Sequence, residues 1–381
     1  MEIALQTRGD YASVLRAARW AEERGLTAFA VPDHYLGSSS DVKAPAWDHL
    51  VHLAGLARET STIHLVDLVS PVTFRHPAVH AKMAATIHDM AGGRFTFGLG
   101  TGWMAEEHSL FGFAFPSQRE RFELLEEQFG YLRALSRGEG FVGKHYQLEE
   151  FTSAPRFEVP LLTGGTGPDR TPALAGRYCD ELNLFPRAPD DLAQRIEVCR
   201  GAARSAGRDP AEIRLSFTAV PIAGIDNATY QTALAAAAEE SDRTPEVLEE
   251  RLTARGVPFG IPDRIQTRLA ELAALGITRL YLQAGTTDPS ELEAKIRPFL
   301  PFLPRRGEKR RSREGAFSRD RKLLGEGDPV GGVESREVVR LDAEVGDSQQ
   351  LAVDNQVAED VTVLGELAGR AEPGTINLDR H

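Results

Sequence analysis

Short apolar runs alternate with amphipathic helical stretches through most of this 381-residue chain. The apolar runs are nearly continuous and rich in Val, Leu, Ile and Phe, which is typical of strands in a parallel sheet that is covered by helices. They fall at residues 3–6, 28–31, 63–69, 95–100, 160–163, 181–185, 214–222 and 279–283. Eight strand–helix alternations in roughly 300 residues favour an α/β fold of the (β/α)8 TIM-barrel type. An open doubly wound sheet is the alternative for this alternation.

The helical stretches predict the outer layer of such a barrel. They fall at residues 11–24, 47–58, 77–90, 119–136, 171–178, 190–206, 261–275 and 290–299, with a longer loop before residue 119. Pro77 suits the first turn of its helix. Two segments interrupt the alternation: residues 138–159 read as a hairpin-like insertion, and residues 226–259 as a mostly helical one after the seventh strand.

The pattern ends near residue 304, so we expect one barrel domain over residues 1–304. A basic block at residues 305–311 opens the last part of the chain, which then mixes acidic and small residues with a single aromatic, Phe317. Few of these residues can pack a core, which predicts a disordered extension over residues 305–381. The basic block reads either as a weak anion-binding arm or as a solvated charge run.

The overall charge excludes some classes of partner. A formal net charge of −12 argues against nucleic acid or an anionic membrane as a partner of the whole chain, because both require a basic surface. No apolar run approaches the roughly 18 residues of a membrane-spanning helix, and the amino terminus lacks a secretory pattern. Cys179 and Cys199 are the only cysteines, so we expect reduced thiols in a cytoplasmic protein.

In a barrel, chemistry lies at the carboxyl ends of the strands. Asp33 and His34 follow the second predicted strand. An acid and an imidazole at a strand end can orient a ligand ring and move a proton, since His titrates near neutral pH. The alternative is that Asp33 caps a turn while His34 makes a local hydrogen bond.

The segment after the third strand carries Arg75, His76 and His80. Arg75 either binds an anion or lies at the surface. The two histidines are four residues apart, but no third ligand with suitable spacing follows, so we expect no metal site.

Glycines alternate after the fourth strand, at Gly98, Gly100 and Gly102, and Trp103 follows. Such glycines let a planar ring or a phosphate approach the backbone. The segment is not a dinucleotide-binding fingerprint, because the third glycine and an immediate helix are missing. Glu106, Glu107 and His108 lie just beyond, where they either supply acid–base groups or face water.

The fifth strand ends in a glycine-rich loop, residues 164–168, that opens a helix. Free backbone N–H groups at a helix amino end form a phosphate site, and Arg170 can strengthen it. A flexible turn is the alternative interpretation.

Taken in order, these segments resemble the luciferase-like monooxygenase superfamily, within it the branch that uses the deazaflavin coenzyme F420. The resemblance covers residues 1–304. It rests on separated motifs in the same order: Val31-Pro32-Asp33-His34, Ser70-Pro71-Val72-Thr73-Phe74-Arg75-His76-Pro77, Gly92-Gly93-Arg94-Phe95, Gly98-Leu99-Gly100-Thr101-Gly102-Trp103, Arg119-Glu120-Arg121-Phe122 and Gly164-Gly165-Thr166-Gly167-Pro168.

The resemblance implies hydride transfer between the deazaflavin and a small organic substrate, with the cofactor supplying the redox chemistry. It implies a non-prolyl cis peptide bond near Leu68-Val69. The implied catalytic residues are His34, as proton donor or acceptor, with Asp33 and Trp103. The implied cofactor-binding residues are Asp33, Leu68, Val69, Ser70, Gly100, Thr101, Gly102, Gly164, Gly165, Thr166, Gly167 and Arg170. The resemblance also allows a homodimer.

Some positions depart from the family pattern. The branch that oxidises glucose 6-phosphate carries a catalytic Glu where Trp103 stands, which argues against a sugar-phosphate dehydrogenase. Val66-Asp67 replaces a usual Gly-Thr, and Asp169 replaces a Lys that is common in relatives.

Two other functions stay open: an FMN-dependent monooxygenase of the same superfamily, and a non-catalytic barrel that only binds a flavin or deazaflavin.

Overall fold

The structure is a computed structural model that describes residues 1–37 and 44–303. Within these residues, eight parallel strands form a closed barrel in the order β3-β2-β1-β11-β10-β9-β8-β5. The strands are β1 (Glu2–Gln6), β2 (Ala28–Val31), β3 (His64–Asp67), β5 (Phe95–Gly100), β8 (Leu161–Gly164), β9 (Glu181–Leu184), β10 (Arg214–Ala219) and β11 (Ile277–Gln283). Pairing of β3 with β5 closes the circle. The (β/α)8 barrel is therefore confirmed, and the open sheet is excluded.

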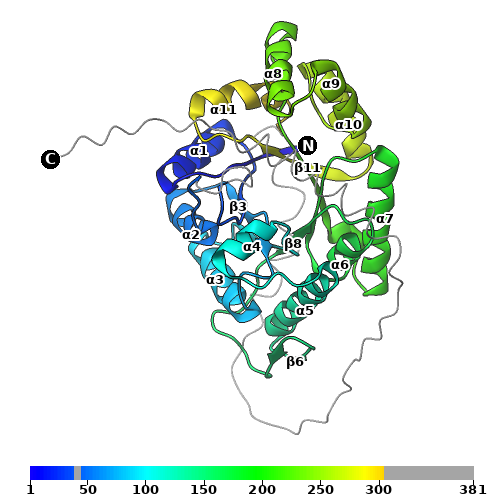
Figure 1. The fold of residues 1–381 in the computed structure, drawn as a ribbon. Helices are drawn as coiled ribbons and strands as arrows, with labels where there is room; N and C mark the ends of the chain where they lie inside the picture. Colours follow the sequence, from blue (N-terminus) through cyan, green and yellow to red (C-terminus); the bar gives the residue numbers. More distant parts are fainter. Residues whose placement is uncertain (38–43, 304–381) are drawn as a thin grey trace, which may run out of the picture. The chain divides into compact units, whose positions relative to one another are not determined.

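Helices surround the strands (Figure 1). The helices that alternate with the strands are α1 (Tyr11–Arg24), α2 (His49–Glu59), α3 (Pro77–Met90), α5 (Gln118–Arg137), α6 (Arg170–Tyr178), α7 (Pro189–Ser205), α10 (Pro262–Ala274) and α11 (Pro289–Ile296). Asp10 and Asp48 cap α1 and α2 by accepting a backbone N–H, and Pro77 occupies the first turn of α3. Local capping therefore places the helix starts where the sequence pattern predicts them.

Side chains alternate along each strand between the two sides of the barrel wall. Ile3 and Leu5 of β1 pack outward against the helices, whereas Ala4 points into the barrel. The inner apolar cluster consists of Ala4, Ala28, Ala30, Val66, Leu68, Leu162 and Tyr281. Small alanines on β1 and β2 leave room for the Tyr281 ring, so the barrel interior is filled.

Both predicted insertions are present. Residues 138–159 contain an antiparallel pair, β6 (Phe141–Val142) and β7 (Gln147–Leu148). Residues 226–259 form α8 (Asn227–Glu240) and α9 (Pro245–Ala254). The long loop expected before residue 119 contains a helix, α4 (Ala105–Phe111), which ends at Gly112 with φ 72°. Seven residues are too few for periodicity to identify a helix, which explains why the sequence pattern missed it.

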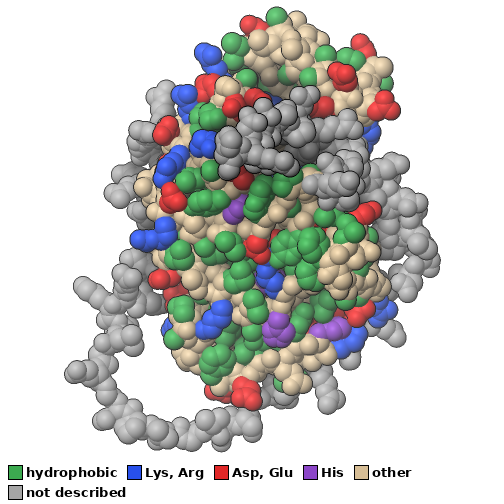
Figure 2. All heavy atoms as spheres, turned by 60° about the vertical axis from the view of Figure 1, so that its left-hand side comes forward, with side chains coloured by type: hydrophobic (Ala, Val, Ile, Leu, Met, Phe, Trp, Pro, Cys, Tyr) green, Lys and Arg blue, Asp and Glu red, His purple; other side chains and the backbone are tan. Residues whose placement is uncertain are grey.

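The predicted extension at residues 305–381 lies outside the described residues, so the boundary near residue 304 stays a prediction. Among the described residues, no helix combines the length and apolarity needed to cross a bilayer. Large exposed apolar side chains include Val51 on α2 and Val79 on α3. The side of the barrel that carries α1, α2 and α3 shows apolar surface interrupted by charged and histidine side chains (Figure 2).

Candidate active site

Asp33 follows β2 at the carboxyl end of the barrel and is fully buried. Its Oδ1 lies 2.6 Å from Nδ1 of His49, and its Oδ2 accepts a hydrogen bond of 2.6 Å from Arg75. Burial opposes the charged form, but His49 and Arg75 hold the pKa of Asp33 well below its usual value. Asp33 is thus an ionised carboxylate with both oxygens in contact with cations of this chain.

His49 continues the contact from β2 to β3. It lies in the first turn of α2, and its Nε2 is 2.9 Å from Oδ1 of Asp67, the last residue of β3. Ser70 donates a hydrogen bond of 2.8 Å to the other oxygen of Asp67. Burial alone would lower the pKa of His49, but the two carboxylates outweigh it and raise that pKa to about 10. His49 is therefore an imidazolium at neutral pH that connects the ends of two adjacent strands.

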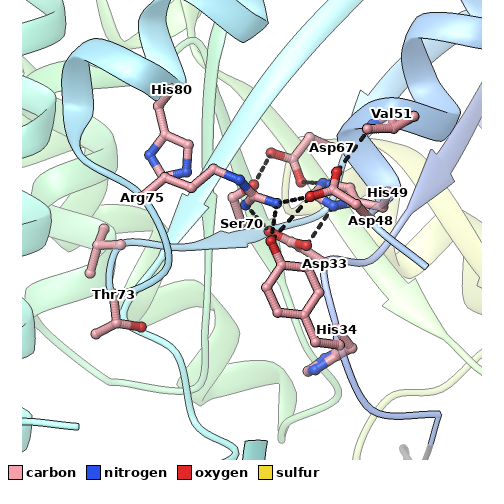
Figure 3. Close-up of polar contacts among 12 residues, drawn as sticks. Asp33, His34, Asp48, His49, Val51, Asp67, Ser70, Thr73, Arg75 and His80 are labelled. Atoms are coloured by element: carbon pink, nitrogen blue, oxygen red, sulfur yellow. Dashed lines mark hydrogen bonds and ion pairs between the residues drawn. The ribbon is translucent and has the colours of Figure 1, made fainter. Parts of the chain in front are cut away.

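Arg75 completes this buried charged cluster. Its side chain is 8% exposed, and besides Asp33 it donates to Asp48, at 2.5 Å, and to the Tyr35 hydroxyl, at 2.6 Å. Both sequence interpretations of Arg75 need correction: it neither lies at the surface nor presents a free guanidinium to an anion. The carboxylates that pair with it come from this chain (Figure 3).

The peptide bond between Leu68 and Val69 is cis, which confirms the expectation from the family resemblance. The Gln6 side-chain amide donates a hydrogen bond of 3.0 Å to the Leu68 carbonyl. A Cβ at Gly98 would lie 2.2 Å from the Asp67 carbonyl oxygen, and one at Gly100 would lie 2.9 Å from Val69. The space beside these two glycines therefore holds the backbone and side chains that follow β3.

His34 points away from the charged cluster (Figure 3). Its side chain is 18% exposed, and its Nδ1 lies 3.3 Å from Oε2 of Glu107 on α4. The Trp103 ring meets His34 edge-on, with 5.6 Å between ring centroids, and Trp103 is 39% exposed. The residues after β2 and after β5 thus form one partly exposed surface, where the imidazole of His34 lies beside the indole of Trp103.

The glycine-rich loop lies at the end of β8 and leads into α6. Asp169, at the amino end of α6, makes no side-chain capping bond to the helix. Below the loop, the buried Arg195 of α7 donates a hydrogen bond of 2.7 Å to the Thr166 carbonyl. Exposed Arg170 stacks on Phe122, with 5.4 Å to the ring centroid. Arg195 thus holds the loop backbone, and among the described residues no side chain accepts from the first N–H groups of α6.

The structure brings the predicted residues together as two groups and a loop. His34 contacts Trp103, whereas Asp33 and Ser70 are joined through His49 and Asp67. Gly102 has a φ of 76°, and a Cβ at this position would lie 3.3 Å from Pro71 and 3.4 Å from Thr73. Residues 164–167 are the last residue of β8 and the loop after it, and Arg170 is the first residue of α6. No described interaction joins the neighbouring Thr101 to either group.

Sequence reasoning missed His49 and Asp67 as partners, and it left Glu107 undecided. His49 is 16 residues from Asp33 and 18 from Asp67, and neither spacing is a signal for contact. A buried carboxylate at position 107 follows from its place on α4, which the sequence pattern did not predict. Among residues 1–37 and 44–303, no group of His, Cys, Asp and Glu could hold a metal ion.

Chemically, this end of the barrel can hold a planar ligand beside His34 and Trp103 and an anionic group at the amino end of α6. The histidine is within reach of solvent and can move a proton. The buried charged cluster joins the end of β3 to the end of β2, next to His34.

The chain is similar to known proteins over most of its length. The family model for luciferase-like monooxygenases matches residues 2–352 of the chain. A similar curated protein is the F420-dependent glucose-6-phosphate dehydrogenase of Kineococcus radiotolerans, which is 29% identical over 74% of this chain and 90% of its own length. The pyrimidine monooxygenase RutA of Stutzerimonas stutzeri is 31% identical over 44% of this chain and 49% of its own length.

Solved structures agree on the fold. An F420-dependent secondary alcohol dehydrogenase in complex with an F420-acetone adduct superposes with a TM-score of 0.66 at 20% identity, covering 80% of this chain and 98% of its own. The long-chain alkane monooxygenase LadA superposes with a TM-score of 0.63 at 14% identity, covering 79% of this chain and 90% of its own.

Proposed function

The chain belongs to the luciferase-like monooxygenase family and is an oxidoreductase, and we propose that it transfers a hydride between coenzyme F420 and a small organic substrate. The proposal rests on one arrangement: a solvent-accessible histidine and a helix start without a side-chain cap lie at the same end of the barrel. The match to an F420-dependent relative over 90% of that relative's length supports the choice of cofactor.

The residues present fit a deazaflavin with a phosphate-bearing tail. The tail requires bare backbone N–H groups, and the start of α6 offers them after a loop of glycines. Arg170 adds a positive charge at the same helix end. The ring requires a flat, partly apolar surface, which the segment around Leu68 and Val69 provides together with Trp103.

When bound, F420 supplies or accepts the hydride, and the protein supplies position and proton transfer. His34 takes a proton from the substrate or returns one to it. Trp103 keeps water from the reacting face. Asp33, fully engaged with His49 and Arg75, holds the end of β2 that carries His34 and is a positioning residue.

The substrate is a small organic molecule other than a sugar phosphate. Trp103 presents an indole where the glucose 6-phosphate branch has its catalytic carboxylate. The relative from Kineococcus radiotolerans acts on glucose 6-phosphate according to its name. Because this chain has Trp103 in place of the carboxylate, we expect no turnover of glucose 6-phosphate, and the compound is a negative control.

The first prediction concerns the cofactor. Titration of the purified protein with F420 is expected to give a saturable change in the fluorescence of F420. Titration with FMN at equal concentration is expected to give no change in the fluorescence of FMN. Gly167→Asp places a negative charge at the amino end of α6 and is expected to weaken F420 binding about 10-fold or more. Asn227→Asp is the matched control, because it adds the same charge at the amino end of the exposed α8.

Several results would contradict the proposal. Binding of FMN alone, with oxygen consumed by the reduced complex, would identify an FMN-dependent monooxygenase. If the protein binds F420 but transfers no hydride to any substrate tested, and if His34→Asn leaves F420 binding unchanged, the protein is a non-catalytic carrier. Loss of F420 binding equal in Gly167→Asp and Asn227→Asp would remove α6 as the anion site.

A further inference from the structure

Glu107 is a buried carboxylate that uses its two oxygens differently. It lies in the first turn of α4 and is 1% exposed. Its Oε1 accepts hydrogen bonds from the backbone N–H groups of Tyr35 and Leu36, the latter at 3.0 Å. Its Oε2 lies 3.3 Å from Nδ1 of His34. One oxygen thus holds the backbone after β2, and the other is directed at the ring that this backbone carries.

A charged carboxylate at this buried position has two backbone donors and a cation close to it. The Arg8 guanidinium donates a hydrogen bond of 3.5 Å to the Leu36 carbonyl. Burial lowers the pKa of Arg8, and the charge of Glu107 opposes this effect. Two backbone donors and a nearby cation satisfy a buried carboxylate that would otherwise be costly.

An ionised carboxylate only accepts hydrogen bonds, so the nitrogen that faces it must carry a proton. Neutral His34 therefore carries its proton on Nδ1, and its Nε2 has a free lone pair. Among the described residues, none forms a hydrogen bond with Nε2. We propose that Glu107 is a positioning residue that fixes the tautomer of His34, so that Nε2 is available as the base for a substrate hydroxyl. This inference deepens the proposed function and rests on it for the role of His34.

Asp33, which precedes His34 in the sequence, does not orient the His34 ring. Both of its oxygens are taken by His49 and Arg75, on the side away from the His34 ring (Figure 3). Trp103 restricts the ring at its edge but offers no acceptor, because an indole nitrogen only donates. Glu107 alone among these three side chains can select the nitrogen that is protonated.

Replacement Glu107→Gln tests this role with little change in shape. The two backbone N–H groups of Tyr35 and Leu36 still need an acceptor, so the amide oxygen stays with them and the amide NH2 faces His34. An NH2 donor requires an acceptor, which reverses the tautomer to the form protonated on Nε2. Glu106→Gln is the matched control, because Glu106 is the exposed neighbour on the same helix and loses the same charge.

Two measurements give the result. Nitrogen-15 NMR of histidine-labelled protein, with the His34 signals assigned from His34→Asn, is expected to show the Nδ1–H tautomer in the unchanged protein and in Glu106→Gln, and the Nε2–H tautomer in Glu107→Gln. In turnover, Glu107→Gln is expected to lower kcat about 10- to 100-fold with unchanged F420 affinity. Glu106→Gln is expected to leave kcat within about twofold.

The proposal is overturned if the unchanged protein already carries the Nε2–H tautomer, a result that does not depend on the folding of Glu107→Gln. It is also overturned if Glu107→Gln lowers F420 affinity and kcat in parallel with a loss of thermal stability, because that is the signature of a structural carboxylate. If F420 fails to bind at all, the proposed function fails while the NMR result still decides the role of Glu107.

Discussion

At the scale of single residues, His49 is the group whose charge the surrounding structure controls most directly. It is buried between carboxylates from two strands, which raise its pKa to about 10 from an ordinary value of 6.5. A histidine with a raised pKa contributes stability that is fully present below pH 6.5 and is lost as the pH rises through 10. Burial acts in the opposite sense on His80, and lowers its pKa to about 3.

We expect His49→Gln to lower the free energy of unfolding by about 3–5 kcal/mol at pH 7, because two buried carboxylates lose their shared cation. Between pH 7 and 10 the unchanged protein is expected to lose up to about 1.4 kcal/mol per pH unit more than the variant does. Urea unfolding at several pH values measures both quantities. His52→Gln, on the same helix, is the control. It should keep the pH dependence of the unfolding free energy seen in the unchanged protein, because the pKa of His52 is lowered and this group does not titrate between pH 7 and 10. Parallel curves for His49→Gln and the unchanged protein would mean that His49 is neutral.

At the scale of elements, close approach between neighbouring segments depends on missing side chains. A Cβ at Gly176 of α6 would lie 2.2 Å from the Cys199 carbonyl of α7, so these two helices can pack only around a glycine. Gly98 plays the same part on β5, where the Asp67 carbonyl lies as close to the missing Cβ. The sequence pattern indicates that the β5 glycines let a ligand approach; beside Gly98 and Gly100 the missing Cβ atoms also leave room for Asp67 and Val69.

Replacement Gly176→Ala is expected to lower the free energy of unfolding by about 1–3 kcal/mol through overpacking. Gly201→Ala is the matched helix control in α7, where the added Cβ meets nothing closer than Arg204, 4.0 Å away. Gly201→Ala is expected to raise the free energy of unfolding by about 0.5–1 kcal/mol. Urea midpoints at constant slope measure both changes. Equal effects at the two glycines would show that α6 and α7 do not pack as described.

At the scale of the whole molecule, a buried polar cluster joins strands from both ends of the barrel sequence. Arg279 on β11 pairs with Glu181 on β9 at 3.2 Å and with Glu2 on β1 at 2.8 Å. Tyr281 donates a hydrogen bond of 3.0 Å to Glu181. This cluster lies at the seam where the last strand meets the first, so barrel closure and charge pairing support each other.

We expect Arg279→Met to lower the free energy of unfolding by about 3–5 kcal/mol, because it leaves Glu181 as an unpaired buried charge. The double variant Arg279→Met, Glu181→Gln should recover part of that loss. Arg200→Met, which breaks an exposed ion pair with Glu197, is the control and should change stability by about 1 kcal/mol or less. Denaturant unfolding of the four proteins gives the comparison, and a double variant no more stable than Arg279→Met would mean that Glu181 is not the partner that matters.

The fold followed from the sequence because its signals are local. The residue pattern of each apolar run and each helical stretch shows which side of that segment is buried. Eight strand–helix repeats favour a barrel, and the pairing of β3 with β5 excludes the open sheet. The starts of the helices at Tyr11 and Pro77 could be predicted for the same reason. So could His34 and the loop at residues 164–167, since they directly follow predicted strands.

Only the tertiary structure decided which charges meet. His49 reaches Asp33 and Asp67, and Glu107 reaches His34, because closing the barrel brings the ends of different strands and helices to one place. No periodicity along the chain encodes those distances. Their pairing depends on strand register and on where α2 and α4 dock, and long-range packing fixes both.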